Sequence, residues 1–486
     1  MTCLEIVKKL VGFARAKLML DKRNELYARN AVLGILGLES YADEGAPYAG
    51  ESSAQLLSLL TEAGTKEGLF SEEDAESVTD AVMGALMISP KETDEAFALR
   101  LRNSSVRAMD WFYEYSVNAD YVKKEKLDKN PRFRAKNGLI VTINLAKPEF
   151  RDPKKAASGN ATKGGYPKCS ICRENEGWGG RNKRTLRTVS LKLGGENWFW
   201  QYSPYGYFKQ HGIAVNCEHT PMHVDKNTFL KLMDFVDSFP HYFLGCNAPL
   251  PRIGGSVLAH DHFQGGGERL PIFDAKSAID MRHKSFPDVA VSVLDWFGTA
   301  VRLTGVNREA IAVLSEYVRT SWLNYRNDAL GIIPEDADGV HSAVSPTVVK
   351  SGKEYEMTLI LRNNVTSEQY PDGVFHAHPE FHVIKKESIG LIEAQGLFIL
   401  PGRLKAQLAE LAKSIAAGKL SDGSKEFRLL YDEITQSGET FSEETALDAI
   451  NEELGSICQR ILNNTAVFKT HRETAEFLQG VGFYAI

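Results

Sequence analysis

The sequence predicts an α+β protein with two successive strand-and-helix halves, a helical N-terminal extension and a helical C-terminal tail. Three observations support this fold class. Residues 1–130 are dominated by Leu, Ala, Lys and Glu, with apolar residues at helical spacing. Between residues 136 and 440, short β-branched and aromatic runs alternate with helical stretches. Residues 441–486 are helical again, with Ser442 as the expected N-cap.

The elements expected in the first half follow from local patterns. The β-branched run Gly138–Leu145 suits a strand, and the Pro- and Gly-rich segment 148–168 suits a loop. The aromatic run 198–208 suits a core strand and a hydrophobic loop, with base or sugar stacking as the functional alternative. Five further strands and one helix are expected: strands Thr185–Leu193, Trp198–Tyr202, Gly212–Cys217, Tyr242–Cys246 and Ser256–Gln264, and helix Phe229–Phe235.

The second half repeats this mixture of elements. Helices are expected at Arg308–Asn327 and Leu404–Ala417, and strands at Glu356–Arg362 and Val374–Ile384. The predicted organisation has four parts: a helical extension over residues 1–135, a first half over 136–285, a second half over 286–440 and a helical tail over 441–486.

Charge and composition exclude several classes of protein. The chain has 57 Lys and Arg against 63 Asp and Glu, and its net charge of −6 offers no footprint for nucleic acid or an anionic membrane. No apolar run approaches the ~18 residues of a membrane span. Residues 1–20 are amphipathic and lack a signal-peptide core, and six cysteines make no disulfide framework in so long a chain. We therefore expect a cytoplasmic protein with no nucleic-acid or membrane partner.

The histidines are concentrated, since 11 of the 12 lie within residues 211–382. The strongest motif, Gly254–Gly267, holds His260, His262 and Gln264 between glycines. On a strand these three side chains would share one face, and the glycines would let a ligand approach the backbone. Two imidazoles and an amide could bind a metal, or supply a nucleophile for phosphorus and a donor to an oxyanion. The alternative is a pair of half-buried histidines with backbone partners.

A second motif is the pair Cys169 and Cys172, separated by two residues. A lone CxxC pair in such a chain is half of a zinc site, a redox pair or two structural thiols. The sequence has no second CxxC pair, so histidines would have to complete a zinc site. The candidates are His219, His223 and His260.

The third motif contains four potential ligands at alternating positions: His376, His378, Glu380 and His382. If this segment is extended, all four share one face and could bind a metal. Pro379 marks an edge strand or a break. The alternative is the polar face of a strand that borders a ligand cleft.

At these motifs the chain resembles the galactose-1-phosphate uridylyltransferases, in particular their second, bacterial type. The resemblance rests on residues 247–256 (NAPLPRIGGS) and residues 260–266 (HDHFQGG), and it covers most of the chain. It implies two histidine-triad-like α+β halves around antiparallel sheets, and a homodimer.

The resemblance also implies roles for single residues. His262 would be the nucleophile that becomes uridylylated, and Gln264 would be the amide that holds the phosphoryl oxygens. A structural zinc ion would be bound by residues far apart in the chain: Cys169, Cys172, His260 and His219, with His223 as the alternative to the last.

Further assignments concern the substrate pocket and a second metal. Asn247 and Ser256 resemble polar residues that line the nucleotide pocket. His376 and His378 resemble part of a second metal region, but residues 362–365 (Arg-Asn-Asn-Val) stand where a further histidine is expected. A second metal is therefore doubtful, and we expect these two histidines to line the cleft for the hexose phosphate.

The reaction that the resemblance implies belongs to galactose metabolism, in the Leloir pathway. UMP would be exchanged between UDP-glucose and galactose 1-phosphate through a covalent uridylyl-histidine. Two alternatives stay open: a histidine-triad nucleotide hydrolase with water as acceptor, and a non-catalytic, zinc-stabilised nucleotide-sugar-binding protein. A free imidazole beside a phosphate favours the enzymes over the binding protein.

Overall fold

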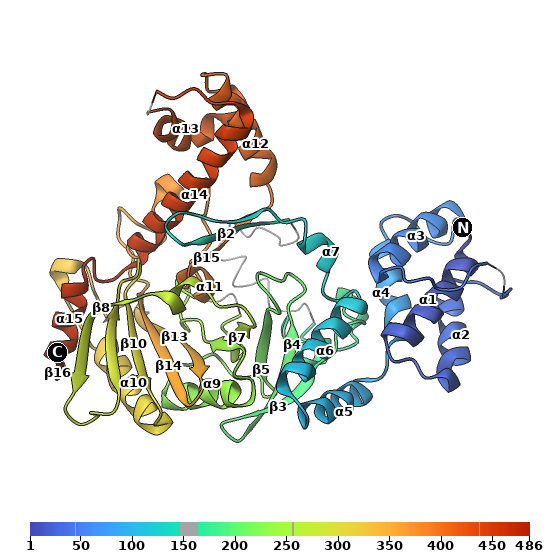
Figure 1. The fold of residues 1–486 in the computed structure, drawn as a ribbon, viewed down its shortest axis with the longest axis horizontal. Helices are drawn as coiled ribbons and strands as arrows, with labels where there is room; N and C mark the ends of the chain where they lie inside the picture. Colours follow the sequence, from blue (N-terminus) through green and yellow to red (C-terminus); the bar gives the residue numbers. More distant parts are fainter. Residues whose placement is uncertain (44, 146–163, 255–256, 437) are drawn as a thin grey trace.

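The computed structural model describes residues 1–43, 45–145, 164–254, 257–436 and 438–486. In Figure 1 the N-terminal helices form one end of the molecule, a long sheet forms its body, and C-terminal helices rise above the sheet. The two termini lie at opposite ends. A mixed helix-and-strand fold with a large antiparallel sheet is thus confirmed. The predicted loop at 148–168 falls mainly outside the described residues.

The N-terminal extension is helical, as its apolar spacing predicts. Its helices are α1 (Cys3–Lys17), α2 (Glu25–Ile35), α3 (Ser53–Lys66), α4 (Ala75–Leu86), α5 (Pro90–Leu101), α6 (Ser105–Asn118) and α7 (Lys124–Leu127). The first four bury a small core of their own, which includes Leu10, Leu60 and Met83. Helices α5 and α6 instead contribute Phe97 and Phe112 to the core beneath the sheet, so they attach the extension to the body.

Within the described residues, 11 strands form one antiparallel sheet in the order β16-β8-β9-β10-β14-β13-β6-β7-β5-β4-β3. From one edge, the strands are β3 (Val189–Leu193), β4 (Glu196–Tyr202), β5 (Gly212–Asn216), β7 (His262–Gly266), β6 (Phe243–Gly245), β13 (Ser342–Ser351), β14 (Glu354–Asn363), β10 (Ala300–Gly305), β9 (Ala290–Leu294), β8 (Ser277–His283) and β16 (Phe483–Ala485). A separate pair is formed by β11 (Glu335–Asp336) and β12 (Gly339–Val340).

The sheet contains the same topology twice. Strands β3, β4 and β5, helix α9 (Lys226–Ser238), then β6 and β7 correspond in order to β8, β9 and β10, helix α10 (Arg308–Leu323), then β13 and β14. Both sets have the same neighbours in the sheet, and β6 pairs with β13 where they meet, with Gly245 opposite Thr347. This sheet crosses the expected boundary at residue 285, because β8 pairs with β9.

Each face of the sheet has its own cover. Helices α9 and α10 pack on one face, with Phe229 and Val318 in a core shared with Phe263. The other face meets α11 (Leu391–Ala394) and the C-terminal helices, and Ile360 and Leu391 belong to that second core. The remaining elements on this side are β1 (Arg132–Arg134), β2 (Ile140–Asn144), which pairs in parallel with β15 (Leu397–Pro401), and helices α12 (Leu404–Ala416), α13 (Arg428–Thr435) and α14 (Glu443–Thr465).

The helical tail begins where the sequence predicts. The side chain of Ser442 accepts a hydrogen bond from the backbone N–H of Thr445, which caps α14. After α14, helix α15 (His471–Gly480) leads to β16 at the edge of the sheet. In the described parts of the chain, no helix has both the length and the apolar character that a bilayer span requires.

Two predicted strands are wrong. The strand expected at Ser256–Gln264 begins only at His262, and a turn and a bend precede it. The segment 374–384 is not a strand, because it consists of turns around the short 3-10 helix Pro379–Phe381. Pro379 has no N–H to offer a neighbouring strand and suits the first turn of a helix, which explains the break.

Gly265 allows β7, the strand that carries His262, to lie close to β6. A Cβ atom at this position would lie 2.1 Å from the carbonyl oxygen of Phe243 on β6. We expect Gly265→Ala to lower the free energy of unfolding by about 1–3 kcal/mol, because the two strands must move apart. Thermal unfolding measures this as a lower Tm. Gly423→Ala is the control, since a Cβ there meets no atom within 4 Å, and equal Tm values for both variants would contradict the prediction.

Candidate active site and metal centre

Four potential metal ligands from three separate segments meet at one end of β7. They are Cys169, Cys172, His219 and His260, and their ligand atoms all lie within 4.8 Å of one another. The Cys172 Sγ lies 3.0 Å from His219 Nδ1, and the Cys169 Sγ lies 3.3 Å from His260 Nδ1. The group therefore combines two thiols with two imidazoles, a donor set that suits a tetrahedral zinc ion.

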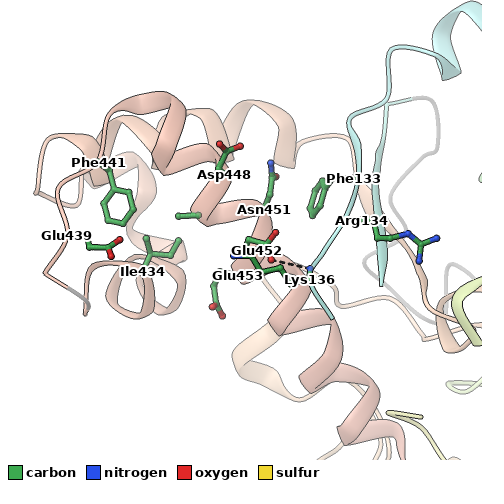
Figure 2. Close-up of a pocket in the computed structure, with 11 residues that line it drawn as sticks. Phe133, Arg134, Lys136, Ile434, Glu439, Phe441, Asp448, Asn451, Glu452 and Glu453 are labelled. Atoms are coloured by element: carbon green, nitrogen blue, oxygen red, sulfur yellow. Dashed lines mark hydrogen bonds between the residues drawn. The ribbon is translucent and has the colours of Figure 1, made fainter. Parts of the chain in front are cut away.

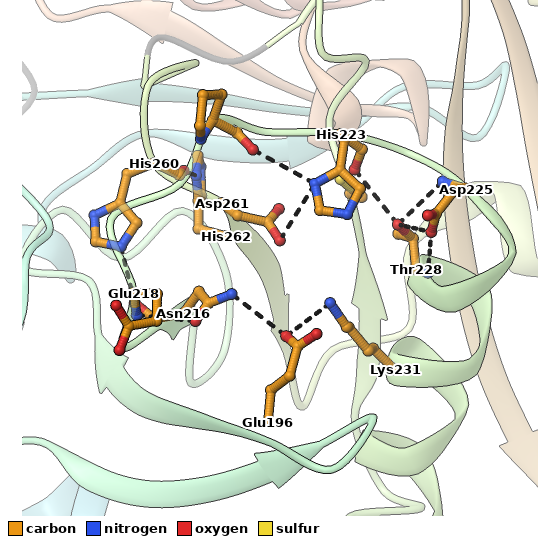
Figure 3. Close-up of polar contacts among 12 residues, drawn as sticks. Glu196, Asn216, Glu218, His223, Asp225, Thr228, Lys231, His260, Asp261 and His262 are labelled. Atoms are coloured by element: carbon orange, nitrogen blue, oxygen red, sulfur yellow. Dashed lines mark hydrogen bonds and ion pairs between the residues drawn. The ribbon is translucent and has the colours of Figure 1, made fainter.

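Backbone contacts orient these ligands before any metal binds. The His260 Nε2–H donates to the Asn216 carbonyl over 2.8 Å, as Figure 3 shows, so its Nδ1 carries the lone pair toward the thiols. The buried Asn175 side chain donates to the carbonyls of Cys169 and Cys172, at 2.8 and 2.9 Å, and fixes the CxxC turn. Burial raises the pKa of Cys172 to about 12, so its thiolate form needs a bound cation. These residues fit a metal ion such as zinc.

The structure decides between the two candidate histidines for the fourth ligand. His219 belongs to the group, whereas His223 lies apart from it with a half-exposed side chain. The His223 Nδ1 lies 3.9 Å from the Asp261 carboxylate and 3.4 Å from the Pro221 carbonyl oxygen (Figure 3). The prediction of His219 is the one that the geometry favours.

A polar network supports the far side of the same turn. Burial raises the pKa of Asp261 to about 6, and this side chain points away from the His262 face of β7. Below it, Glu196 accepts from the buried Lys231 ammonium at 2.8 Å and from the Asn216 side chain at 3.4 Å (Figure 3). Asn216 therefore connects this network to the ring of His260.

His262 stands at the first position of β7 with its ring almost fully buried. Its Nδ1–H donates to the His260 carbonyl over 2.8 Å, so the lone pair of the neutral ring is on Nε2. Burial lowers the pKa of His262, which favours this neutral form. A neutral imidazole with one nitrogen held by the backbone and the other free is the form that attacks an electrophile.

Gln264 shares the face of β7 on which His262 lies. The register pairs His262 with Val215 and Gln264 with Ile213, and alternate residues of a strand point to one side. The prediction that His260 shares this face is wrong. His260 precedes the strand, and its ring turns toward the cysteines. The motif therefore divides between the Cys/His group, which takes His260, and β7, which carries His262 and Gln264 on one face.

The predicted substrate-binding residues have other contacts in the structure. The Asn247 Oδ1 accepts from the backbone N–H of Leu391 at 2.8 Å, which joins α11 to the sheet. His376 Nδ1 lies 3.1 Å from the Ala377 carbonyl, and His378 Nε2 lies 3.2 Å from the Val374 carbonyl. Ser256 falls outside the described residues. The assignment of these four residues to substrate binding stays a prediction.

The potential ligands of segment 375–382 do not come together as a metal site. Because it is not a strand, its histidines do not align, and His378 stacks on Tyr370 with ring centroids 4.1 Å apart. Among the described residues, the Cys/His group above is the one set of potential ligands within mutual reach. The absence of a second metal at His376 and His378 stays a prediction.

Two buried polar residues were missed as site candidates. Arg362 on β14 is 1% exposed, and burial lowers its pKa to about 10. Its Nη2 donates to the Ile389 carbonyl at 2.9 Å, while Nε and Nη1 have no partner among the described residues. His211, directly before β5, is 3% exposed, and its Nε2 also has no hydrogen-bond partner among the described residues. The one signal near His211 in the sequence is the aromatic run that ends at Phe208, and it does not single out this histidine.

A hollow of about 600 Å³ lies elsewhere, between the β1 segment and the helices of the C-terminal lobe (Figure 2). Phe133, Lys136, Phe441, Asp448 and Glu452 are among the residues that line it. It includes none of the predicted site residues, so it is separate from the chemistry of β7.

The fold and the site together define a class of protein. A free imidazole nitrogen beside an amide donor, on a glycine-rich strand next to a Cys/His metal group, is suited to group transfer through histidine. Family models agree: the N-terminal domain of galactose-1-phosphate uridyl transferase matches residues 20–221, and its C-terminal domain matches residues 234–428.

Relatives extend this match to the whole chain. The chain is 49% identical to a galactose-1-phosphate uridylyltransferase of Bifidobacterium longum, over 99% of this chain and 98% of that protein. It is 35% identical to one of Clostridium acetobutylicum, over 95% and 96% of the two chains. Among solved structures, yeast Ap4A phosphorylase aligns with 59% of this chain and 86% of its own, at 12% identity and a TM-score of 0.34, too weak a likeness to assign a fold.

The chain belongs to the galactose-1-phosphate uridylyltransferase family. Its activity is accordingly that of a galactose-1-phosphate uridylyltransferase, a nucleotidyl transfer of galactose metabolism.

The metal group predicts a joint loss of metal and stability. We expect Cys172→Ser to reduce bound zinc and to lower Tm together, because the remaining three ligands hold the ion less tightly and the turn before β7 loosens. Metal analysis and thermal unfolding of the same preparation measure both quantities. Cys217→Ser is the matched control, since Cys217 lies outside the ligand group. An unchanged zinc content in Cys172→Ser would refute this assignment.

Burial of His376 predicts a dependence of stability on pH. Burial lowers its pKa from 6.5 to about 4, so the unfolded chain takes up the proton first as the pH falls. Stability is therefore lost between about pH 6.5 and 4, by up to about 1.4 kcal/mol per pH unit. We expect His376→Gln to flatten the fall of Tm over this range. His471→Gln, which changes a half-exposed ring, should leave the slope as in the wild type, and equal slopes in all three proteins would argue against the mechanism.

Proposed function

We propose that this chain transfers the uridylyl group of UDP-glucose to galactose 1-phosphate through a covalent uridylyl-histidine on His262. The observation that carries the proposal is the state of the His262 ring. Its Nδ1–H is held by the His260 carbonyl at 2.8 Å, which leaves Nε2 as the nucleophile, and Gln264 lies two residues away on the same face. Family membership supplies the donor and acceptor substrates.

The reaction proceeds by two displacements at one phosphorus atom. The Nε2 lone pair of His262 attacks the α-phosphorus of UDP-glucose, and the bond to the bridging oxygen breaks, which releases glucose 1-phosphate. A phosphate oxygen of galactose 1-phosphate then attacks the same phosphorus, and the electron pair of the P–N bond returns to His262. A sugar phosphate leaves as an anion, so no proton donor is required for either step.

Two protein groups stabilise this path. The His262 ring gains positive charge as it bonds to phosphorus, and the His260 carbonyl oxygen on Nδ1–H stabilises that charge. The amide N–H groups of Gln264 donate to the phosphoryl oxygens, where negative charge collects. Both contacts depend on positions fixed by the sheet rather than on acid–base catalysis.

A structural role for zinc follows from the ligand count. When bound, zinc would take all four positions from the protein, namely Cys169, Cys172, His219 and His260, and would add stability rather than chemistry. The strand with His262 begins two residues after His260, so the ligand group restrains the position of the nucleophile.

The remaining proposals concern architecture and substrate binding. The repeated topology of the sheet supports two histidine-triad-like halves. Their bounds are proposed as residues 136–285 and 286–440 between the extension and the tail, although β8, inside the first range, belongs to the second set of strands. Family membership supports a homodimer. Asn247, Ser256, His376 and His378 are proposed to contact the nucleotide and the hexose phosphate, without a second metal.

Mass spectrometry of the intact protein tests the covalent step. After incubation with UDP-glucose alone, we expect the mass of one uridylyl group to be added on the peptide that contains His262. The addition should vanish in His262→Gly and persist in His283→Gly, which changes a histidine of β8. Absence of the adduct in the wild type would defeat the mechanism. Steady loss of UDP-glucose without galactose 1-phosphate would instead favour a hydrolase.

A further inference from the structure

The loop before β5 buries a histidine whose ring is not explained by packing alone. His211 is 3% exposed, and its Nε2 has no hydrogen-bond partner among the described residues. Leaving a buried polar group unpaired costs free energy, because the group loses its hydrogen bonds to water. Such a group in a protein interior indicates a hydrogen bond that forms when the site binds its substrate.

Two aromatic rings hold the imidazole in place. Tyr207 stacks on it with ring centroids 4.8 Å apart and an interplanar angle of 23°, and Phe208 contacts it at 4.6 Å. The backbone N–H of Tyr207 lies 3.5 Å from His211 Nδ1 and donates toward it. In a neutral ring the proton is then on Nε2, so the unpaired atom is a donor. Burial lowers the pKa of His211 to about 4, which keeps the ring neutral at physiological pH.

The strand register places this donor beside the site. Ile213 lies opposite Gln264 and Val215 lies opposite His262. His211 lies directly before β5 and two residues before Ile213, and its carbonyl accepts from the Ser203 N–H at 2.9 Å, which continues the β4–β5 pairing. Because alternate residues share a face, His211 lies on the face of Ile213. The side chain of Gln264 is close enough to interact with the His211 ring and favours its protonated form.

We propose that His211 is a positioning residue that donates its Nε2–H to the amide oxygen of Gln264 and so turns the amide nitrogen of Gln264 toward the phosphoryl group. This inference rests on the proposed function and adds the group that sets the orientation of the phosphoryl donor. A glutamine amide has two orientations of nearly equal shape, but only one presents N–H groups to the substrate. A neutral Nε2–H selects that orientation, because it can bond only to the oxygen.

A double-mutant cycle tests the proposal. The variants are His211→Phe, Gln264→Ala and their combination, and the measured quantity is the single-turnover rate of glucose 1-phosphate release from UDP-glucose. We expect His211→Phe to lower this rate about 3- to 10-fold, the effect of one neutral hydrogen bond, with little change in KM. In the Gln264→Ala background the same substitution should change the rate less than 2-fold, since the amide that it orients is gone.

Two further variants separate positioning from packing. His211→Gln keeps an N–H donor and should recover part of the lost rate, whereas His211→Leu should not. His241→Phe is the matched control, because the His241 ring also has unpaired buried nitrogens but packs against Tyr242, and it should leave the rate unchanged. If His211→Phe does not fold, as judged by Tm, His211→Leu replaces it in the cycle.

The outcomes distinguish this inference from the proposed function. Equal fold-losses from the His211 substitution with and without Gln264 would overturn the positioning role while the uridylyl-histidine stands. A wild-type protein that forms no adduct would remove the proposed function itself. A partial recovery by His211→Gln, with no recovery by His211→Leu, is the result that supports the hydrogen bond.

Discussion

The bend at residues 260–262, where β7 begins, is the constraint on which the site depends. Its backbone is held by Asp261 N–H on the Thr220 carbonyl at 2.7 Å and by Asn216 N–H on the Asp261 carbonyl at 3.1 Å. The ring of His260 adds a bond to the Asn216 carbonyl, and the ring of His262 adds one to the His260 carbonyl. One short stretch of backbone thus positions both His260 of the Cys/His group and the ring of His262.

The sheet repeats a topology, but its two halves do not repeat the chemistry. In the first half β7 contributes His262 and Gln264, while the corresponding strand of the second half, β14, has no histidine and buries Arg362. The antiparallel pairing of β6 with β13 joins the halves into one surface, and α11 is fastened to it through Asn247. The second half thereby pairs with β6, the neighbour of the strand that carries His262 and Gln264.

Much of the site could be predicted because its motifs are local. The residue types and spacing of the CxxC pair and of the glycine-flanked histidines indicate which chemistry each motif can support. The strands β4, β5 and β14 were predicted from β-branched and aromatic residues. The two wrong strand predictions arose where the residue pattern suited a strand but the segment has no neighbouring strand to pair with in the described chain. Residues 257–261 form a turn and a bend, with His260 directed to the cysteines, and residues 374–384 bend because Pro379 cannot pair. The role proposed for His211 could not be predicted, because it follows from a cross-strand register.

By itself the sequence determined the mixed helix-and-strand fold class and a short set of possible metal ligands, and it predicted His262 as the nucleophile, since each of these depends on residue types within a few positions. Only the tertiary structure showed that His219, which the resemblance favours, lies beside Cys172, whereas the half-exposed His223 lies beside Asp261. It also decided which ring nitrogens are free, because that is set by carbonyls of Asn216 and His260. The proximity of Cys169 to His260, 91 positions later in the chain, is created by the fold and is contained in no local pattern.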